Sequence, residues 1–210
     1  MKGRFISLEG GEGSGKSTCL AYIQSWLENK SIPYLTTREP GGTSLAEDIR
    51  QLVLNDREES VHDLTELLLV FASRAQHINE KIKPALDSGL CVVSDRFIDS
   101  SFVYQGVARG GDMDKIQTLS DWVVKECLPD RTILLDVPVE IGLQRVQSRQ
   151  QSDRLDKESV EFHEKVRQGF LERAYKDKGR FSIVDASQSI KAVLKDIDIA
   201  LNAAFHLDKY

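Results

Sequence analysis

Short apolar runs alternate with longer segments of helical periodicity along most of this chain. The apolar runs have the length of buried strands and occupy residues 5–8, 34–36, 90–93, 132–135 and 181–184. Between and after them, apolar residues recur at helical spacing, for example across residues 64–82 and 190–201. Strands that alternate with helices predict an α/β fold: a five-stranded parallel sheet with helices on both faces. Ligands then bind at the carboxyl ends of the strands.

One segment departs from this pattern. Residues 147–156 are polar, rich in Arg, Gln and Asp, and lie between two helical segments. We interpret them as a mobile surface excursion, a short lid. The remaining chain contains no repeat, low-complexity tract or linker, and its 210 residues predict a single domain over 1–210.

Composition narrows the classes of partner. The formal net charge is −5 and no run of five Lys or Arg occurs, which argues against a general binder of nucleic acid or of anionic membranes. No stretch has the length of a membrane span, and the N-terminus lacks an apolar signal segment. Cys19, Cys91 and Cys127 are scattered, as reduced core thiols are. We therefore expect a cytoplasmic protein.

The strongest motif follows the first apolar run. Residues 10–17 fit the phosphate-binding pattern G-x-x-x-x-G-K-[ST] and precede a predicted helix over 18–29. Glycines allow backbone N–H groups to turn toward phosphates, and the start of the helix adds its positive dipole end. Lys16 would reach the β- and γ-phosphates and Ser17 would hold Mg²⁺. The expected nucleotide-binding residues are Gly10, Gly11, Glu12, Gly13, Ser14, Gly15, Lys16, Ser17 and Thr18. The alternative is a flexible glycine-rich turn.

Charged residues also follow the second and third predicted strands. Asp95 and Arg96 end the third, where Asp95 could hold Mg²⁺ through a water and Arg96 could bind an acceptor phosphate. An internal ion pair that caps the strand is the alternative. Arg38 and Glu39 follow the second strand at the equivalent place, and Arg50 lies on the next helix, where a solvated residue is the default.

The polar excursion carries Arg149 and Arg154. A closing segment with guanidinium groups can neutralise the charge that spreads over a transferred phosphoryl group. A well-hydrated loop is the simpler interpretation of the same residues.

No H-R-D-x-x-x-x-N loop or comparable general base is present, which counts against a kinase that acts on a hydroxyl group. A phosphate monoester is mostly dianionic at neutral pH, because its second pKa is about 6, and it can attack a γ-phosphorus without a base. Positioning and charge neutralisation then suffice. These residues indicate a nucleoside monophosphate kinase.

With these motifs the chain resembles the bacterial thymidylate kinase (dTMP kinase) family over nearly its whole length. The resemblance rests on the phosphate loop with an acidic residue inside it, residues 37–42, the Asp95 to Phe97 signature, residues 100–106 and the arginines of the excursion. It implies transfer of the γ-phosphoryl group of ATP to dTMP, giving dTDP for DNA synthesis, with Mg²⁺. It also implies a homodimer packed through helices, which the apolar richness of residues 64–82 supports weakly.

The resemblance assigns further roles, position by position. Glu12 would accept a hydrogen bond from the 3′-hydroxyl group of dTMP, and Tyr104 would lie under the sugar. Arg74 and Gln105 would read the O4 side and the N3 edge of thymine. Acceptor phosphate would meet Arg38, Arg50 and Arg96, and the lid would supply Arg149 and Arg154. The substrate site would also include Glu39, Ser100 and Ser101.

The chain departs from the family at the base-stacking position. The family commonly has an aromatic residue four places before the thymine-reading arginine, but this chain has Val70 there, followed by Phe71. Either Phe71 takes over or Val70 makes a flatter apolar contact. We name Phe71 as the candidate and keep Val70 open, because a Phe at helical spacing is often a core residue.

The sequence leaves two other functions to consider. A phosphate-loop kinase for a different nucleoside monophosphate is the nearest alternative, since the loop does not define the acceptor. A nucleotide-dependent switch would need an N-K-x-D run or a D-x-x-G segment after a strand, and the sequence contains neither in that context.

Overall fold

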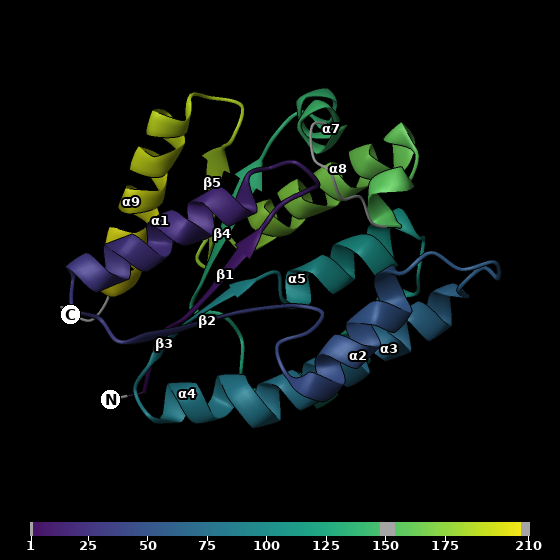
Figure 1. Cartoon of the computed structure of the whole chain (residues 1–210), viewed down its shortest axis with the longest axis horizontal. Helices are drawn as coiled ribbons and strands as arrows, with labels where there is room; N and C mark the ends of the chain where they lie inside the picture. The colour runs from purple at the N-terminus through teal and green to yellow at the C-terminus, as the bar shows by residue number, and fades with distance from the viewer. Residues whose placement is uncertain (1, 148–153, 207–210) are drawn as a thin grey trace.

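A single five-stranded sheet organises the computed structural model, which describes residues 2–147 and 154–206 (Figure 1). The strands run in the order β2-β3-β1-β4-β5, and every neighbouring pair is parallel. Their bounds are β1 Phe5–Glu9, β2 Tyr34–Arg38, β3 Cys91–Asp95, β4 Arg131–Asp136 and β5 Phe181–Asp185. All five strands expected from the apolar runs are thus confirmed, as is the parallel α/β sheet.

The sheet is apolar on both faces because helices cover both. Ile6 and Leu8 of β1 face one core cluster, while Phe5 faces another on the opposite side. In β3, Val93 packs in the first of these clusters and Val92 in the second. Successive side chains of a strand point to opposite faces, so a strand buried on both sides reads as a continuous apolar run.

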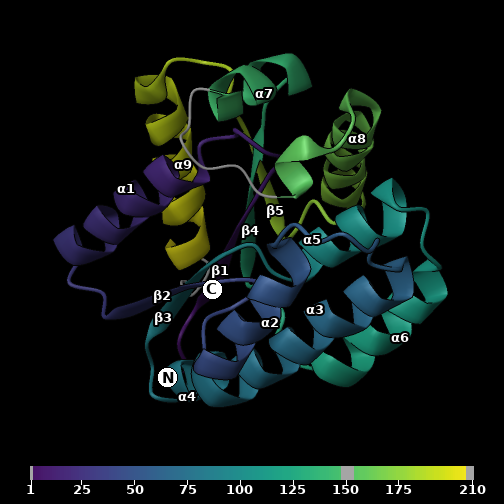
Figure 2. The same ribbon diagram turned by 45° about the vertical axis from the view of Figure 1, so that its right-hand side comes forward.

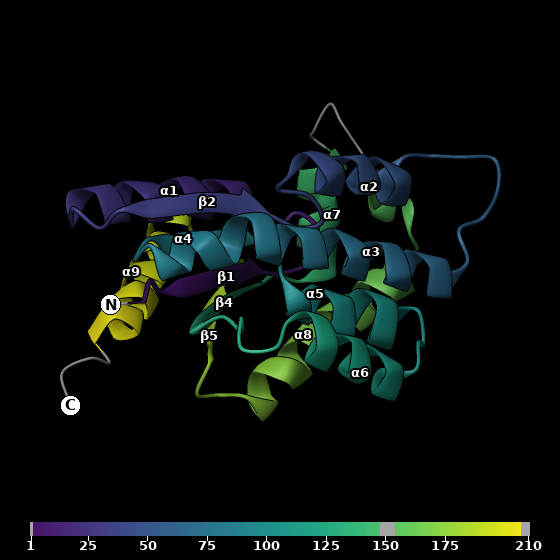
Figure 3. The same ribbon diagram turned by 90° about the horizontal axis from the view of Figure 1, so that it is seen from below.

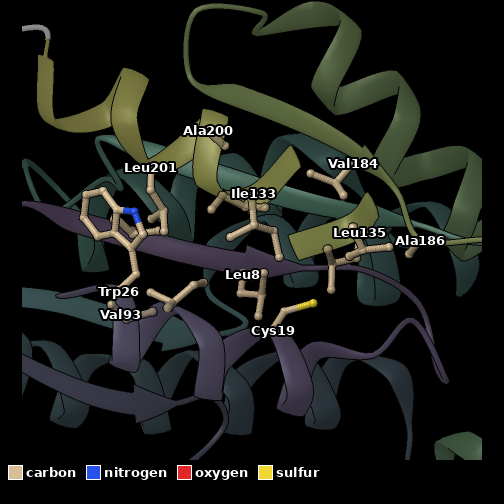
Figure 4. Close-up of a cluster of buried hydrophobic side chains, with 14 of the residues drawn as sticks. Leu8, Cys19, Trp26, Val93, Ile133, Leu135, Val184, Ala186, Ala200 and Leu201 are labelled. Carbon is tan, nitrogen blue, oxygen red and sulfur yellow. The ribbon is translucent and has the colours of Figure 1, made fainter. Parts of the chain in front are cut away.

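Helices α1 (Lys16–Asn29) and α9 (Ile190–His206) cover the first face and lie side by side (Figures 1 and 2). Figure 4 shows their contact with the strands: Trp26 and Cys19 of α1, and Ala200 and Leu201 of α9, surround Ile133 of the sheet. The Trp26 indole Nε1 donates to Asp198 Oδ1 at 2.7 Å, which satisfies the polar end of a largely buried ring. This layer fixes the helix that follows the phosphate loop.

The opposite face carries more helices. They are α3 (Asp63–His77) with η1 (Ile78–Ile82) and α4 (Lys83–Asp87), α5 (Ile98–Ser101) with η2 (Phe102–Ala108), α6 (Met113–Val123) and α8 (Val160–Lys176). Figure 2 shows α3 beside α6, in agreement with their shared core cluster. Among the helices described, none is long and apolar enough to cross a lipid bilayer.

Three elements stand at the carboxyl edge of the sheet. They are α2 (Ser44–Leu54), α7 (Val139–Gln147) and the 3₁₀ turn η3 (Leu155–Lys157). Figure 3 shows α2 packed along α3. Of the expected lid over 147–156, Gln147 ends α7, Arg154 precedes η3 and residues 155–156 belong to η3, while 148–153 lie outside the described residues. The expected site and these elements therefore share one edge of the sheet.

Candidate active site

The phosphate loop joins β1 to α1 through glycines in the left-handed region. Gly13 has φ 69° and Gly15, the residue that caps α1, has φ 92°. A Cβ on Gly13 would also lie 2.0 Å from the carbonyl oxygen of Gly142, so only glycine fits there. Lys16 Nζ donates to the carbonyl oxygens of Gly10 and Gly11 at 3.1 Å each. Burial, followed by the nearby charge of Arg96, lowers the pKa of Lys16, because both disfavour its charged form.

A cavity of about 540 Å³ opens beside this loop. Such a volume is typical of a small-molecule site. Its walls come from the loops after β1, β2 and β3, from α2, α3 and η2, and from Leu155 and Asp156. Most of the residues expected from the sequence line it: Glu12, Gly13, Gly15, Lys16, Ser17, Glu39, Arg50, Arg74, Asp95, Arg96, Ser100, Ser101, Tyr104 and Gln105.

Glu12, Arg96 and Tyr104 form a largely buried cluster that lines the cavity. Glu12 Oε1 lies 2.6 Å from Arg96 Nη2 and accepts from the Tyr104 hydroxyl group at 2.8 Å. Burial alone would raise the pKa of Glu12, but the charges of Arg96 and Lys16 and the Tyr104 hydrogen bond lower it to about 2. The glutamate therefore stays ionised and holds the arginine above the tyrosine ring, 4.9 Å from its centroid.

Arg74 is fixed by a second buried cluster. Its side chain is 1% exposed, with Nε 2.7 Å from Glu39 Oε2, Nη1 donating to Ser101 Oγ and Nη2 to the Phe97 carbonyl oxygen. The guanidinium group packs against the rings of Phe71 and Phe97 at 5.0 and 5.4 Å. Because every nitrogen has a partner, Arg74 presents a rigid cationic wall to the cavity.

Two sequence expectations need correction. Phe71 is 3% exposed in the core cluster of α3, α4 and α6 and does not line the cavity; Val70 does, because the helix turns the neighbouring position toward it. Arg38 also lies off the cavity wall. Its side chain is 55% exposed and pairs with Glu47 of α2 at 2.9 Å, which holds it off the lining.

Sequence reasoning missed Glu66. This glutamate of α3 is 2% exposed on the cavity wall and accepts from Gln105 Nε2 at 2.9 Å and from Arg154 Nη2. Gln105 and Tyr104 project from η2, where hydrogen bonds such as Arg109 N to Tyr104 O, 3.1 Å, span five residues and widen the helix. The local pattern does not single out Glu66, because residues 64–82 contain other polar side chains, Ser73, His77 and Glu80 among them.

The structure describes one of the two arginines of the expected lid. Arg149 lies outside the described residues. Arg154 is docked at the end of α2: its backbone N–H donates to the Leu54 carbonyl oxygen and Nε to that of Val53, at 3.4 and 3.2 Å. Arg154 itself does not line the cavity, although Val53, Leu54 and Glu66, which it contacts, do. Sequence reasoning also missed Arg145 of α7, which donates to the carbonyl oxygens of Ala186 and of Gly13 in the loop.

Ser17 and Asp95 meet the requirements of a cation site. Both line the cavity, and Asp95 Oδ1 is buried without a hydrogen-bond partner, although buried carboxylate oxygens almost always have one. The described residues contain no group of three or more His, Cys, Asp or Glu side chains with metal-ligand spacing. A hydroxyl group and one carboxylate suit a hard cation that takes its other ligands from phosphate and water.

Two buried acidic side chains, Glu9 and Asp99, hold the segment after β3 in place. Glu9, at the end of β1, accepts from Phe97 N at 2.8 Å and from Ser100 Oγ at 2.7 Å. Burial, together with the nearby charge of Asp99, raises the pKa of Glu9 to about 7. Asp99 itself pairs with Arg173 and Arg180, each at 2.6 Å. These contacts fix the segment that carries Arg96 and Ser100 against the first strand.

The cysteines take no part in this chemistry. Cys19, Cys91 and Cys127 are free and buried, as the sequence predicts. Burial raises the pKa of the Cys19 and Cys127 thiols to about 11 and that of Cys91 to about 12, which makes all three poor nucleophiles.

Comparison with known proteins identifies relatives of the whole chain. The sequence model of a family described as thymidylate kinase matches residues 8–197. A thymidylate kinase of Marinomonas sp. (strain MWYL1) is 63% identical over 198 residues, 94% of this chain and 93% of the relative. One from Teredinibacter turnerae is 47% identical, over 97% of this chain and 99% of the relative. One from Carboxydothermus hydrogenoformans is 46% identical, over 94% and 96%.

Proposed function

The chain belongs to the thymidylate kinase family, and we propose on that premise that it transfers the γ-phosphoryl group of ATP to dTMP, giving dTDP and ADP. One observation carries the proposal. The phosphate loop and the buried Arg74–Gln105 wall line the same cavity, so that a nucleoside monophosphate held by that wall would direct its phosphate toward the loop.

ATP would bind with its phosphates on the loop. Backbone N–H groups at the start of α1 and the Lys16 ammonium group attract polyphosphate, because both present positive charge where the chain has no side-chain bulk. When bound, Mg²⁺ neutralises charge on the transferred phosphoryl group. Ser17 would hold the ion directly and Asp95 through a water, which its unpartnered Oδ1 supports.

The acceptor phosphate would be oriented by Arg96 and Arg50. Arg96 is held by Glu12 and also donates to the Gly10 carbonyl oxygen at 3.1 Å, so it bridges the loop and the acceptor side of the cavity. Arg50 reaches the cavity from α2 and donates to the Pro40 carbonyl oxygen at 2.8 Å. A dianionic phosphate between these groups needs no general base to attack the γ-phosphorus.

Sugar and base would lie farther along the same cavity. Glu12 would accept the 3′-hydroxyl group and Tyr104, 3% exposed, would leave no space for a 2′-hydroxyl group. Arg74 would donate to O4 of thymine and Gln105 would meet N3. Val70, rather than Phe71, would contact the base. A site of this kind discriminates because a wrong base leaves buried polar groups unpaired.

Arg154, and Arg149 with it, would neutralise charge on the transferred phosphoryl group. To reach that group, Arg154 would leave its contacts with Glu66 and with the Val53 carbonyl oxygen. An arginine that acts mainly in the transition state contributes to turnover more than to substrate affinity.

We also propose a cytoplasmic homodimer. Neighbouring helices α3 and α6 carry exposed apolar side chains, among them Leu64, Leu68, Met113 and Trp122, the last 73% exposed. Exposed apolar side chains on two neighbouring helices favour self-association. Analytical ultracentrifugation of the wild type and of Trp122→Glu would test it: a dimer that dissociates in the variant supports the proposal, and a monomeric wild type contradicts it.

Product analysis tests the proposed reaction. The protein, ATP, Mg²⁺ and dTMP should yield ADP and dTDP in equal amounts, resolved by ion-exchange chromatography. Lys16→Ala is the matched control. Its turnover should fall about 100-fold or more, while its far-ultraviolet circular dichroism spectrum stays like that of the wild type. Release of ADP without formation of dTDP would contradict the proposal and indicate a hydrolase.

A further inference from the structure

Glu66 connects the residue expected to read the base with the arginine at the cavity edge. Its Oε1 accepts from Gln105 Nε2 at 2.9 Å, and its Oε2 accepts from Arg154 Nη2. Arg109 Nη2 lies 3.9 Å from the same Oε2. Glu66 is 2% exposed and shielded from water, so its carboxylate oxygens form their hydrogen bonds with these partners.

The contact with Glu66 determines which way the Gln105 amide faces. An ionised carboxylate only accepts hydrogen bonds, whereas an amide has a donating NH₂ group and an accepting oxygen. Gln105 must therefore turn its NH₂ group toward Glu66. Among the described residues none donates to Gln105 Oε1, and Gln105 lines the cavity, so the amide presents an acceptor there.

We infer that Glu66 is a specificity-determining residue, which positions Gln105 so that the site accepts a base with a ring N–H and rejects one with a ring lone pair. The inference rests on the proposed function, in which the N3 edge of thymine meets Gln105. Thymine and uracil carry a hydrogen at N3 and can donate to Gln105 Oε1. Cytosine has a lone pair at N3, which would face another lone pair.

The contact with Arg154 predicts how the side-chain amide would be oriented in a Glu66→Gln variant. A guanidinium group only donates. In Glu66→Gln, the new amide oxygen must therefore face Arg154, and its NH₂ group must face Gln105. Gln105 would then turn its oxygen toward residue 66 and its NH₂ group into the cavity. One nearly isosteric change thus inverts the hydrogen-bonding character of the base-reading group.

Steady-state kinetics with dTMP, dUMP and dCMP as acceptors test the inference. In Glu66→Gln the preference for dTMP over dCMP, as a ratio of kcat/KM values, should fall by about 10-fold or more, because a mispaired buried polar group is what rejects cytosine. The preference for dTMP over dUMP should not change, since both bases carry N3–H. Arg74 still opposes the exocyclic amine of cytosine, so part of the preference persists.

Two further variants distinguish a change in base specificity from a general loss of activity. Arg154→Ala should leave the dTMP to dCMP ratio unchanged, because Glu66 remains a carboxylate that only accepts from Gln105. In a Gln105→Ala background, Glu66→Gln should leave the dTMP to dCMP ratio unchanged, because there is no amide to turn. Thermal melting of each variant establishes that it is folded.

The outcomes are distinct. An active wild type whose dTMP to dCMP preference survives in Glu66→Gln, or in which both acceptors lose activity equally, overturns the role of Glu66 and leaves the kinase function intact. A ratio that changes equally with and without Gln105 also overturns it. A wild type that does not phosphorylate dTMP refutes the proposed function itself.

Discussion

Arg96 Nη2 lies 2.6 Å from Glu12 Oε1, and this ion pair ties the end of β3 to the phosphate loop after β1. Arg96 adopts φ 66°, a backbone conformation rare outside glycine, so the pair is made at the expense of local strain. The consequence is that the proposed acceptor-binding arginine and the proposed donor-binding loop share one rigid unit. Such preorganisation suits a reaction that depends on positioning rather than on a base.

Acid should weaken the fold through Glu12. Its pKa is lowered to about 2, below the ordinary value of 4.5, so its stabilising contribution is present above pH 4.5 and lost as the pH falls toward 2. Glu12→Gln should show a smaller loss of stability over that window. Urea unfolding of both proteins at several pH values measures the difference, and parallel curves would show that the ion pair contributes nothing.

Glu9 should act in the opposite direction. Because its pKa is raised to about 7, the folded state binds more protons than the unfolded state between pH 4.5 and 7, and stability due to Glu9 falls as the pH rises through that window. Glu9→Gln should therefore gain stability relative to the wild type toward alkaline pH. The scale is roughly 1.4 kcal/mol for each unit of pKa shift. A difference between the two proteins that is independent of pH would refute the role.

Arg154→Ala should reduce kcat about 100-fold or more and raise the KM for dTMP much less, since its phosphoryl contact forms mainly in the transition state. Lys157→Ala is the matched control on the same turn: it removes an exposed ion pair with Asp56 and should leave kcat nearly unchanged. Equal losses of turnover and dTMP affinity in Arg154→Ala would assign this arginine to acceptor binding instead.

Substitutions at Val70 and Phe71 should differ in their effect on the KM for dTMP. Val70→Ala should raise the KM for dTMP about 10-fold, since each buried CH₂ group contributes about 0.8 kcal/mol, and, because Val70 is only 7% exposed, should also lower stability. Phe71→Leu should cost about 1–2 kcal/mol of unfolding free energy, because the side chain fills the core, and leave KM unchanged. Steady-state kinetics and urea unfolding measure these effects, and a KM raised in Phe71→Leu but not in Val70→Ala would return Phe71 to the base site.

The sequence was sufficient where the determinants are local. The strands are runs of apolar residues buried on both faces, and the phosphate loop needs its glycines and Lys16 at fixed spacing. The order of the strands then brings Glu12, Asp95 and Arg96 to one edge, because the carboxyl ends of β1 and β3 are neighbours. Their meeting in one cavity follows from topology.

The remainder depends on helix rotation and on side chains distant in sequence. Whether Val70 or Phe71 reaches the cavity is decided by less than one third of a helical turn. Glu66 and Arg154 are 88 residues apart, and no local pattern predicts that they pair. Arg38 has the right position at a strand end, but Glu47 of the next helix draws it away.

The most direct test of the central claim is a comparison of acceptors under identical conditions. With ATP and Mg²⁺, a coupled assay of ADP release should give the highest kcat/KM for dTMP, with dUMP next and dCMP, AMP and dGMP far lower. That order is expected because Arg74 and Gln105 together match only O4 and N3–H of a pyrimidine. Equal or greater activity with AMP, dGMP or dCMP would contradict the account.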